Sequence, residues 1–173
     1  MGEAATAPFS MNPTIRELRP SNAEAVSTLS LASFERFIAG SWSSAACNEY
    51  RALVSASALS NSIESCAYSV GAFNEHRLLG FLLMPRPSLV QMFFVDPELV
   101  RQGIGRSLWK YARGEVEARF PEAKTIELNA SPYAVEFYRS LGFVPISKEF
   151  ESKGFRATRM ACWLAARALG AEL

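Results

Sequence analysis

A short loop with two glycines constrains this chain most, because it joins an apolar run to an amphipathic helical pattern. The apolar run ends at Val95, Asp96-Pro97 turns the chain, and the Gly103-x-Gly105 spacing comes immediately before the helical pattern. Glycines at this spacing let backbone amides point into one concave space, where the dipole of the following helix adds partial positive charge. Arg101 and Arg106 add full charges. The loop predicts an anion site suited to the phosphates of a cofactor, although glycines before helices also serve as plain turns.

Two common nucleotide-binding motifs are excluded in this loop. A nucleotide P-loop needs an earlier glycine and a Gly-Lys-Ser/Thr triplet, whereas Gly105 is followed by Arg106-Ser107 and Val100 stands where the earlier glycine belongs. A dinucleotide-binding fingerprint needs a third glycine at the position that Leu108 occupies. What remains is a short nest of backbone amides, which suits a pyrophosphate.

The composition indicates one ordinary globular domain. The chain has 173 residues, of which 49% are hydrophobic, and this is enough for one sizeable core. The formal net charge is only +1, and no apolar run reaches the roughly 18 residues of a membrane span, so we expect neither nucleic acid nor a membrane as a partner. Three irregularly spaced cysteines and one histidine predict buried thiols in a reducing, cytoplasmic setting and no metal site.

Hydrophobic periodicity predicts helices and strands in alternation along the chain. Residues 1–12 have no pattern and are expected to be a mobile tail, and residues 13–173 are expected to form a single domain. Strands are expected at 14–19, 66–73, 77–84, 88–95, 125–129, 143–150 and 155–164. Helices are expected from a capping box at Ser21 and Glu24 to about Gly40, at 48–59 before a polar break at 60–62, at 103–120, and from an N-cap at Ser131 to Gly142. This order predicts an α+β (mixed α/β) fold with helices on the faces of a sheet.

A second stretch, from Asn129 to Phe143, gives the glycine loop a more specific meaning. It places the aromatic pair Phe137-Tyr138 shortly before a Gly-Phe pair. Together with Val95-Asp96-Pro97 and the loop from Arg101 to Gly105, it resembles the GNAT superfamily of acyl-CoA-dependent N-acetyltransferases, with a matching order of elements over residues 14–164. The resemblance implies a central, mostly antiparallel sheet of six to seven strands that splays open after Val95, with about four helices on its faces.

The resemblance also implies that acetyl-CoA binds in the opening of the sheet, without a metal. Its pantetheine arm is expected along the strand backbone at Phe93 and Val95, which would polarise the thioester carbonyl. Its pyrophosphate is expected on the loop amides of Arg101, Gln102, Gly103, Ile104, Gly105 and Arg106. The family's loop usually begins with Gln or Arg, whereas Val100 stands here, but the backbone makes the main contacts. Asn129 either bonds the pantetheine or substrate or is an ordinary turn residue.

The catalytic proton donor that the resemblance implies is Tyr138, which matches a tyrosine near the CoA sulfur in many members of the family. A phenol is a sensible donor to a leaving thiolate, although Tyr138 also fits a plain apolar contact on its helix face. No side-chain base is evident, because Gln91 stands where relatives often have glutamate. Glu35, Glu49 or Glu127 would act through water, or the amine arrives neutral.

The acceptor is expected to be a primary amine of a small molecule or peptide, bound near Phe34 and Trp42. Trp42 lies in a loop between two predicted helices, where it either forms an edge of the substrate cleft or packs on the helix pair. A homodimer through the final strands is suggested by family analogy alone. The alternative function, from another class, is a non-catalytic acyl-CoA-binding module that senses the cofactor or regulates a partner.

Overall fold

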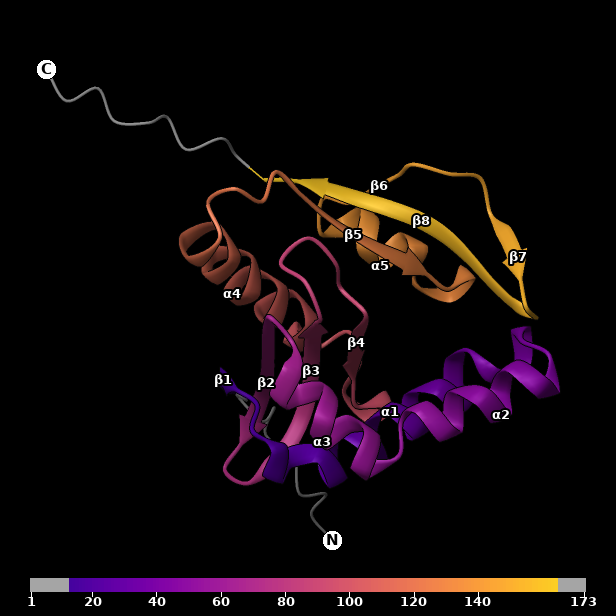
Figure 1. Cartoon of the computed structure of the whole chain (residues 1–173), viewed down its shortest axis with the longest axis horizontal. Helices are drawn as coiled ribbons and strands as arrows, with labels where there is room; N and C mark the ends of the chain where they lie inside the picture. The colour runs from indigo at the N-terminus through magenta and orange to yellow at the C-terminus, as the bar shows by residue number, and fades with distance from the viewer. Residues whose placement is uncertain (1–12, 165–173) are drawn as a thin grey trace, which may run out of the picture.

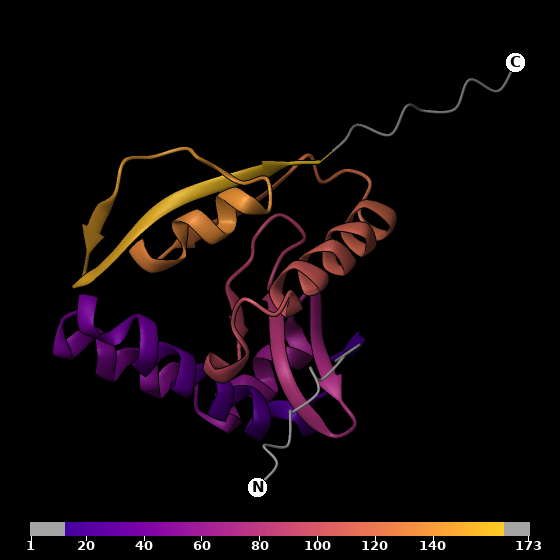
Figure 2. The same ribbon diagram turned by 180° about the vertical axis from the view of Figure 1, so that it is seen from behind.

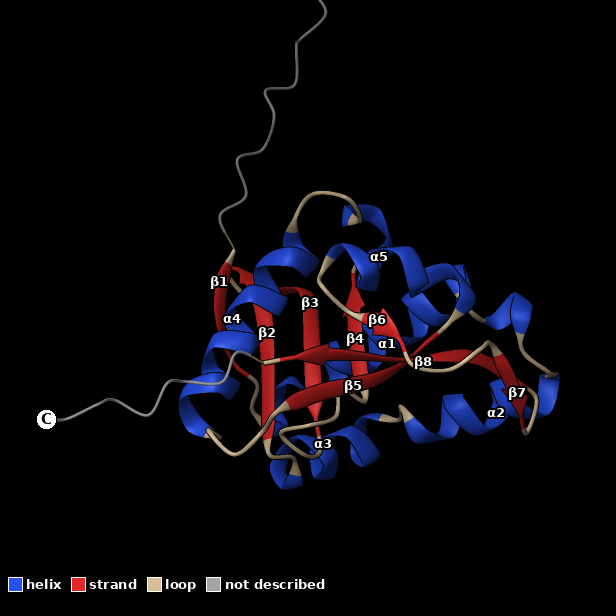
Figure 3. Ribbon diagram, turned by 90° about the horizontal axis from the view of Figure 1, so that it is seen from above, coloured by secondary structure: helices blue, strands red, loops and turns tan. Residues whose placement is uncertain are grey.

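The computed structural model describes residues 13–164, which form two antiparallel sheets whose strands run steeply across one another (Figures 1 and 3). The first sheet has the order β1-β2-β3-β4, and in the second β8 lies between β5 and β6 and also pairs with β7. The expected tail at residues 1–12 and the end of the expected domain at 165–173 lie outside the described residues. The strands are β1 (Thr14–Glu17), β2 (Tyr68–Asn74), β3 (Arg77–Met84), β4 (Met92–Val95), β5 (Thr125–Ala130), β6 (Val144–Pro145), β7 (Phe150–Ser152) and β8 (Phe155–Trp163).

The helices cover both faces of the first sheet. Buried side chains of α4 pack with one face of β2 and β3, and those of α1 and α3 pack with the other face. None of the helices in residues 13–164 is long and apolar enough to cross a bilayer. The helices are α1 (Ala23–Phe37), α2 (Ser44–Leu53), α3 (Ala56–Ser65), α4 (Ile104–Arg119) and α5 (Val135–Ser140), with 3-10 turns η1 (Pro20–Asn22), η2 (Ala39–Ser41), η3 (Pro97–Leu99) and η4 (Pro132–Ala134).

The two sheets meet at one point and then part. The Val90 amide donates to the Glu127 carbonyl (2.9 Å), and the Glu127 amide donates to the Ser88 carbonyl (2.8 Å). Beyond this point β4 pairs only with β3 and β5 pairs only with β8, so a gap opens between β4 and β5. The predicted splayed, mostly antiparallel α+β fold is therefore confirmed, with eight strands and five α-helices among residues 13–164.

Helix α4 carries an apolar stripe, as the amphipathic pattern of its sequence predicts. Ile104, Leu108, Ala112 and Val116 are all buried, because residues four apart lie on one face of a helix. Leu108 packs so closely on β3 that a Cβ added to Gly80 would lie 3.1 Å from the Leu108 Cδ1 atom. This stripe fixes α4 against the first sheet.

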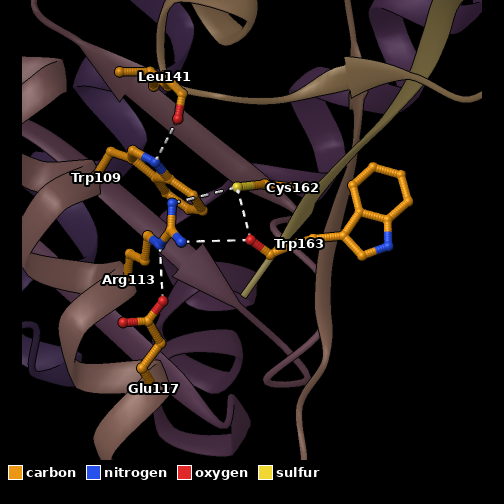
Figure 4. A network of polar contacts seen from close by, with 6 residues as sticks. All are labelled: Trp109, Arg113, Glu117, Leu141, Cys162 and Trp163. Carbon is orange, nitrogen blue, oxygen red and sulfur yellow. Dashed lines mark hydrogen bonds and ion pairs between the residues drawn. The ribbon is translucent and has the colours of Figure 1, made fainter. Parts of the chain in front are cut away.

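Polar contacts attach the other side of α4 to the second sheet (Figure 4). Arg113 donates to the Glu117 carboxylate (2.9 Å), the Trp163 carbonyl (3.4 Å) and the Cys162 sulfur (3.7 Å). The Trp109 indole donates to the Leu141 carbonyl (3.1 Å), just beyond α5. Helix α4 is thus held by both sheets, and its N-terminus is fixed beside the gap.

The single helix predicted at 48–59 is wrong. The structure has two helices, and the chain is extended at Ser55 between them (ψ 148°). Helix α2 begins earlier than predicted because Ser43 is its N-cap and accepts from the Ala46 amide (3.2 Å). The predicted polar break at 60–62 lies inside α3, where Ser62 bonds back to the Ala58 carbonyl (2.9 Å).

Three other boundaries differ from the predictions. Ser21 does not cap a helix, because residues 20–22 form η1 and α1 begins at Ala23. The strand expected at 88–95 is regular only in β4. The strand expected at 143–150 is regular only at β6, where Pro145 has no amide to donate, and at Phe150, where β7 begins. The helix expected after Ser131 is a 3-10 turn followed by α5, and Gly142 follows it with φ +94°, as predicted for a helix end.

The three cysteines are free thiols. Cys47 and Cys162 are buried as predicted, whereas Cys66 is partly exposed.

Candidate active site

The gap between β4 and β5 forms a cavity of about 920 Å³. Its walls come from β4, the start of α4, the end of β5, the η4–α5 segment, the start of β8 and the α1–α2 region. Gln102 and Phe34 are not among the lining residues, although both were predicted for the site. The other predicted site residues all line it: Trp42, Phe93, Val95, Arg101, Gly103, Ile104, Gly105, Arg106, Asn129 and Tyr138.

The start of α4 presents unpaired backbone donors to this cavity. Gly103 is the N-cap residue, with φ +84°, a left-handed conformation that glycine adopts without strain. The first amide bonded back is that of Ser107, which donates to the Gly103 carbonyl (2.9 Å). The amides of Ile104, Gly105 and Arg106 have no acceptor within the helix, so they form an anion nest at its positive end.

Gly105 brings this nest close to the gap. A Cβ atom at Gly105 would lie 2.8 Å from the Phe137 Cζ atom and 3.4 Å from the Val95 Cγ2 atom. The missing side chain therefore lets α4 approach β4 and α5 closely. Arg106 reaches across the same contact and donates to the Ser140 carbonyl at 3.3 Å.

The outer edge of β4 directs backbone groups into the gap. The Asp96 amide donates to the Leu79 carbonyl (2.8 Å), and antiparallel pairing alternates, so Phe93 and Val95 direct their backbone groups away from β3. The Ser33 hydroxyl, from α1, donates to the Val95 carbonyl (2.9 Å). Among residues 13–164, nothing pairs with the Val95 amide or with either backbone group of Phe93, so these groups remain for a ligand.

Ser33 is a site residue that the sequence analysis missed. It is buried and lines the cavity from α1, whose buried face also contains Ser27 and Ser30. A serine on the buried face of a helix was the available signal, because a buried hydroxyl needs a partner. The partner is a strand carbonyl 62 residues further along the chain, which periodicity alone does not reveal.

Tyr138 lies on the α5 side of the cavity. Its ring packs against the rings of Phe137, Phe143 and Phe93, with centroids 5.4, 5.6 and 6.1 Å away. Burial in this aromatic cluster raises the pKa of the Tyr138 hydroxyl above its usual value. The side chain is thus both an apolar contact and a protonated group beside the cavity.

The three candidate bases differ in whether they line the cavity. Glu35 pairs with Arg51 (2.7 Å) and Glu127 pairs with Arg159 (2.6 Å), and neither carboxylate lines the cavity. Glu49, on α2, does line it. Among residues 13–164, no three His, Cys, Asp or Glu side chains gather where they could hold a metal ion.

Phe34 lies behind the cavity wall. It is fully buried, stacks on Tyr50 at 4.2 Å between ring centroids, and meets the edge of Trp42 at 5.3 Å. Phe34 therefore supports Trp42 and Tyr50, which line the cavity, and does not line it itself. The two interpretations of Trp42 both describe its position, since it packs on the helix pair and also faces the cavity.

The fold and sequence were compared with known proteins. A structure of a GCN5-related N-acetyltransferase from Rhodopseudomonas palustris matches with a TM-score of 0.77 at 20% identity, covering 94% of this chain and 100% of the other. The PaiA N-acetyltransferase of Thermoplasma acidophilum, solved in complex with coenzyme A, matches with a TM-score of 0.73 at 20% identity, covering 89% and 100%. An aminoglycoside 6'-N-acetyltransferase complexed with coenzyme A matches with a TM-score of 0.65 at 17% identity, covering 87% and 96%.

The similarity of the sequence to known proteins is weaker than the similarity of the fold. A search of curated proteins returned no relative. The family model of the acetyltransferase (GNAT) domain, however, matches residues 38–164, which is most of the chain and includes every wall of the cavity except α1. The chain therefore belongs to the GNAT family of acetyltransferases.

Proposed function

We propose that the protein moves an acetyl group from acetyl-CoA directly to a primary amine of a small molecule or peptide. The observation that carries this proposal is that one cavity combines the amide nest of α4, the free edge of β4 and Tyr138. Each feature suits a different part of the donor, namely its pyrophosphate, its pantetheine arm and its sulfur. Two of the similar structures were solved with coenzyme A, which supports the assignment of the donor.

The residues of the nest suit a pyrophosphate. The free amides of Ile104, Gly105 and Arg106 would donate to its oxygens, and the side chains of Arg101 and Arg106 would balance its charge. The edge of β4 would pair with the amides of the pantetheine arm as a further strand does, and Asn129 would bond the arm or the acceptor. Gln102 would contribute only through its position in the loop.

The transfer itself is a single displacement at the thioester carbonyl. The neutral amine adds to the carbonyl carbon and forms the new C–N bond, and the Val95 amide would donate to the oxygen that becomes negative. The C–S bond then breaks as this tetrahedral intermediate collapses. Tyr138 would give its proton to the departing sulfur. The proton lost by the amine would pass through water to Glu49, the one of the three candidate carboxylates that lines the cavity.

The proposal is tested by incubating the purified protein with acetyl-CoA and a panel of primary amines, and by following thiol release and the mass of the acetylated product. We expect amine-dependent release with one acetyl group per product molecule. If acetyl-CoA binds tightly and no amine on the panel is acetylated, the protein is instead a non-catalytic sensor of acyl-CoA.

The close approach at Gly105 predicts a loss of donor binding in Gly105→Val. The branched side chain would meet Phe137 and push α4 away from β4, so the nest would move from its place. We expect the Kd for acetyl-CoA to rise at least about tenfold, which is roughly 1.4 kcal/mol, in isothermal titration calorimetry. An unchanged Kd would show that the nest does not hold the donor.

Gly114→Ala is the matched control on the same helix. Gly114 is exposed in the middle of α4, and a Cβ there would meet no atom within 4 Å. Alanine favours the helix more than glycine does, so we expect the free energy of unfolding to rise by about 1 kcal/mol. Urea denaturation measures this change, and the Kd for acetyl-CoA should stay that of the unsubstituted protein.

A further inference from the structure

One end of the cavity lies between α2 and the β7–β8 hairpin and has aromatic walls. Trp42 lies 5.5 Å from Phe155 and 5.9 Å from Tyr50, measured between ring centroids, and all three line the cavity. In Figures 1 and 2, α2 and β7 lie together at one edge of the molecule. The nest, by contrast, is at the N-terminus of α4, so the aromatic end and the pyrophosphate end of the cavity are formed by different elements.

The charges around the cavity argue against a polycationic acceptor. Its walls include two carboxylates, Glu49 and Glu136, and three guanidinium groups, Arg101, Arg106 and Arg156. Glu136 is already paired with Arg139, at 3.5 Å. Arg156 is likewise paired with Glu149, and Arg101 and Arg106 are assigned to the pyrophosphate. Among the charged residues of the cavity wall, Glu49 is thus left for one ammonium group, and a chain of several ammonium groups would find no further carboxylate.

A hydrogen bond closes the far wall of the aromatic end of the cavity. The Ser43 amide, at the start of α2, donates to the Gly154 carbonyl in the turn between β7 and β8 (2.8 Å). The approach is so close that a Cβ at Gly154 would lie 2.0 Å from the Ser43 Oγ atom. A compact acceptor fits in front of this bridge, whereas a peptide that continued past it would have to separate α2 from the hairpin.

Trp42 adds a polar preference to the aromatic walls. Its indole nitrogen is buried, and no hydrogen-bond acceptor for it exists among residues 13–164. A buried donor without a partner favours a ligand that supplies an oxygen. An aromatic ring that bears a hydroxyl group matches both the walls and this donor.

We propose that this end of the cavity is the acceptor subsite and that it takes a compact arylalkylamine, with one amine and an oxygen on its ring. The inference rests on the proposed acetyl transfer and specifies its acceptor. The ring packs against the wall formed by Trp42, Tyr50 and Phe155, the Trp42 N–H donates to the ring oxygen, and the amine points toward Val95 and Tyr138.

The first test compares four amines with acetyl-CoA: tyramine, phenethylamine, butylamine and spermidine, with kcat/KM expressed per neutral amine. We expect tyramine to exceed butylamine at least about tenfold, since burying a ring is worth more than 1.4 kcal/mol. Phenethylamine should lie between them and spermidine should be poorest. Equal values for tyramine and butylamine, or a preference for spermidine, would overturn the subsite.

Two substitutions test the walls of the acceptor subsite. Phe155→Ala should raise the KM for tyramine about tenfold and leave the KM for acetyl-CoA unchanged. Trp42→Phe keeps a ring but removes the N–H, so it should abolish the preference for tyramine over phenethylamine. Trp163→Ala is the control, because Trp163 is exposed and does not line the cavity. A tyramine preference that survives Trp42→Phe would contradict the assigned hydrogen bond.

Calorimetry of tyramine with the CoA-bound protein separates this inference from the proposed function. Binding that is weakened by Phe155→Ala, without acetylation, would keep the subsite and reject the transfer reaction. Acetylation of all four amines without preference would keep the reaction and reject the subsite.

Discussion

Replacement of Tyr138 by phenylalanine is expected to lower kcat by about 10²-fold or more, the usual contribution of a positioned general acid. The ring, which packs on Phe93, Phe137 and Phe143, is kept, so the fold and the KM for acetyl-CoA should not change. Only the proton for the departing sulfur is lost. Steady-state kinetics with saturating acetyl-CoA measures the effect. Tyr111→Phe is the matched control, because Tyr111 is exposed on α4 and does not line the cavity.

The pH dependence of kcat provides a second test of Tyr138 as the acid. An acid works in its protonated form, and burial raises the pKa of Tyr138 above the usual tyrosine value. The loss of rate due to Tyr138 should therefore begin only above that usual value of about 10, and kcat should show no Tyr138-dependent decline near neutral pH. The Phe variant should lack this alkaline decline. Equal kcat and an identical alkaline limb in the variant would remove Tyr138 as the acid.

Leu108→Ala is expected to lower the free energy of unfolding by about 3–5 kcal/mol, a large share of the stability of a single domain. Leu108 is fully buried, and its contact with β3 near Gly80 is so close that the surroundings have little freedom to fill the space left behind. Denaturation in urea measures the loss. Leu53→Ala should cost less than about 0.5 kcal/mol, because 68% of Leu53 is exposed. A loss below 1 kcal/mol at Leu108 would mean that α4 is not anchored by this stripe.

The parts of the fold that were predictable are those with long, regular patterns. The α4 stripe repeats through four buried residues, and the strand pair of β2 and β3 is rich in apolar residues on both sides of a polar turn. The break between α2 and α3 was not predictable, because residues 44–65 contain no glycine or proline. The break depends on packing against α1, where the Ser27 hydroxyl donates to the Val54 carbonyl, and such a contact is a tertiary feature.

The local motifs of the candidate site were predictable from the sequence, whereas their arrangement in space was not. The glycine loop and Tyr138 belong to recognisable local motifs, and the structure brings both to one cavity. Phe34 was expected at the surface of the cleft and lies behind its wall, because periodicity places a residue on a buried face without saying what lies beyond its neighbours. Ser33 donates a hydrogen bond to a strand 62 residues away, and the sequence around Ser33 does not reveal this partner.

The single meeting point of the two sheets has a consequence for the order of folding. Residues 14–119 contain the whole first sheet and α1 to α4, whereas β5 to β8 and α5 come from the last segment of the described chain. During synthesis the first part therefore emerges with its own core before the second exists. The cavity is completed only when the second sheet joins the first. A ligand that spans it would bind the finished protein alone, and would stabilise that state in proportion to the logarithm of its concentration.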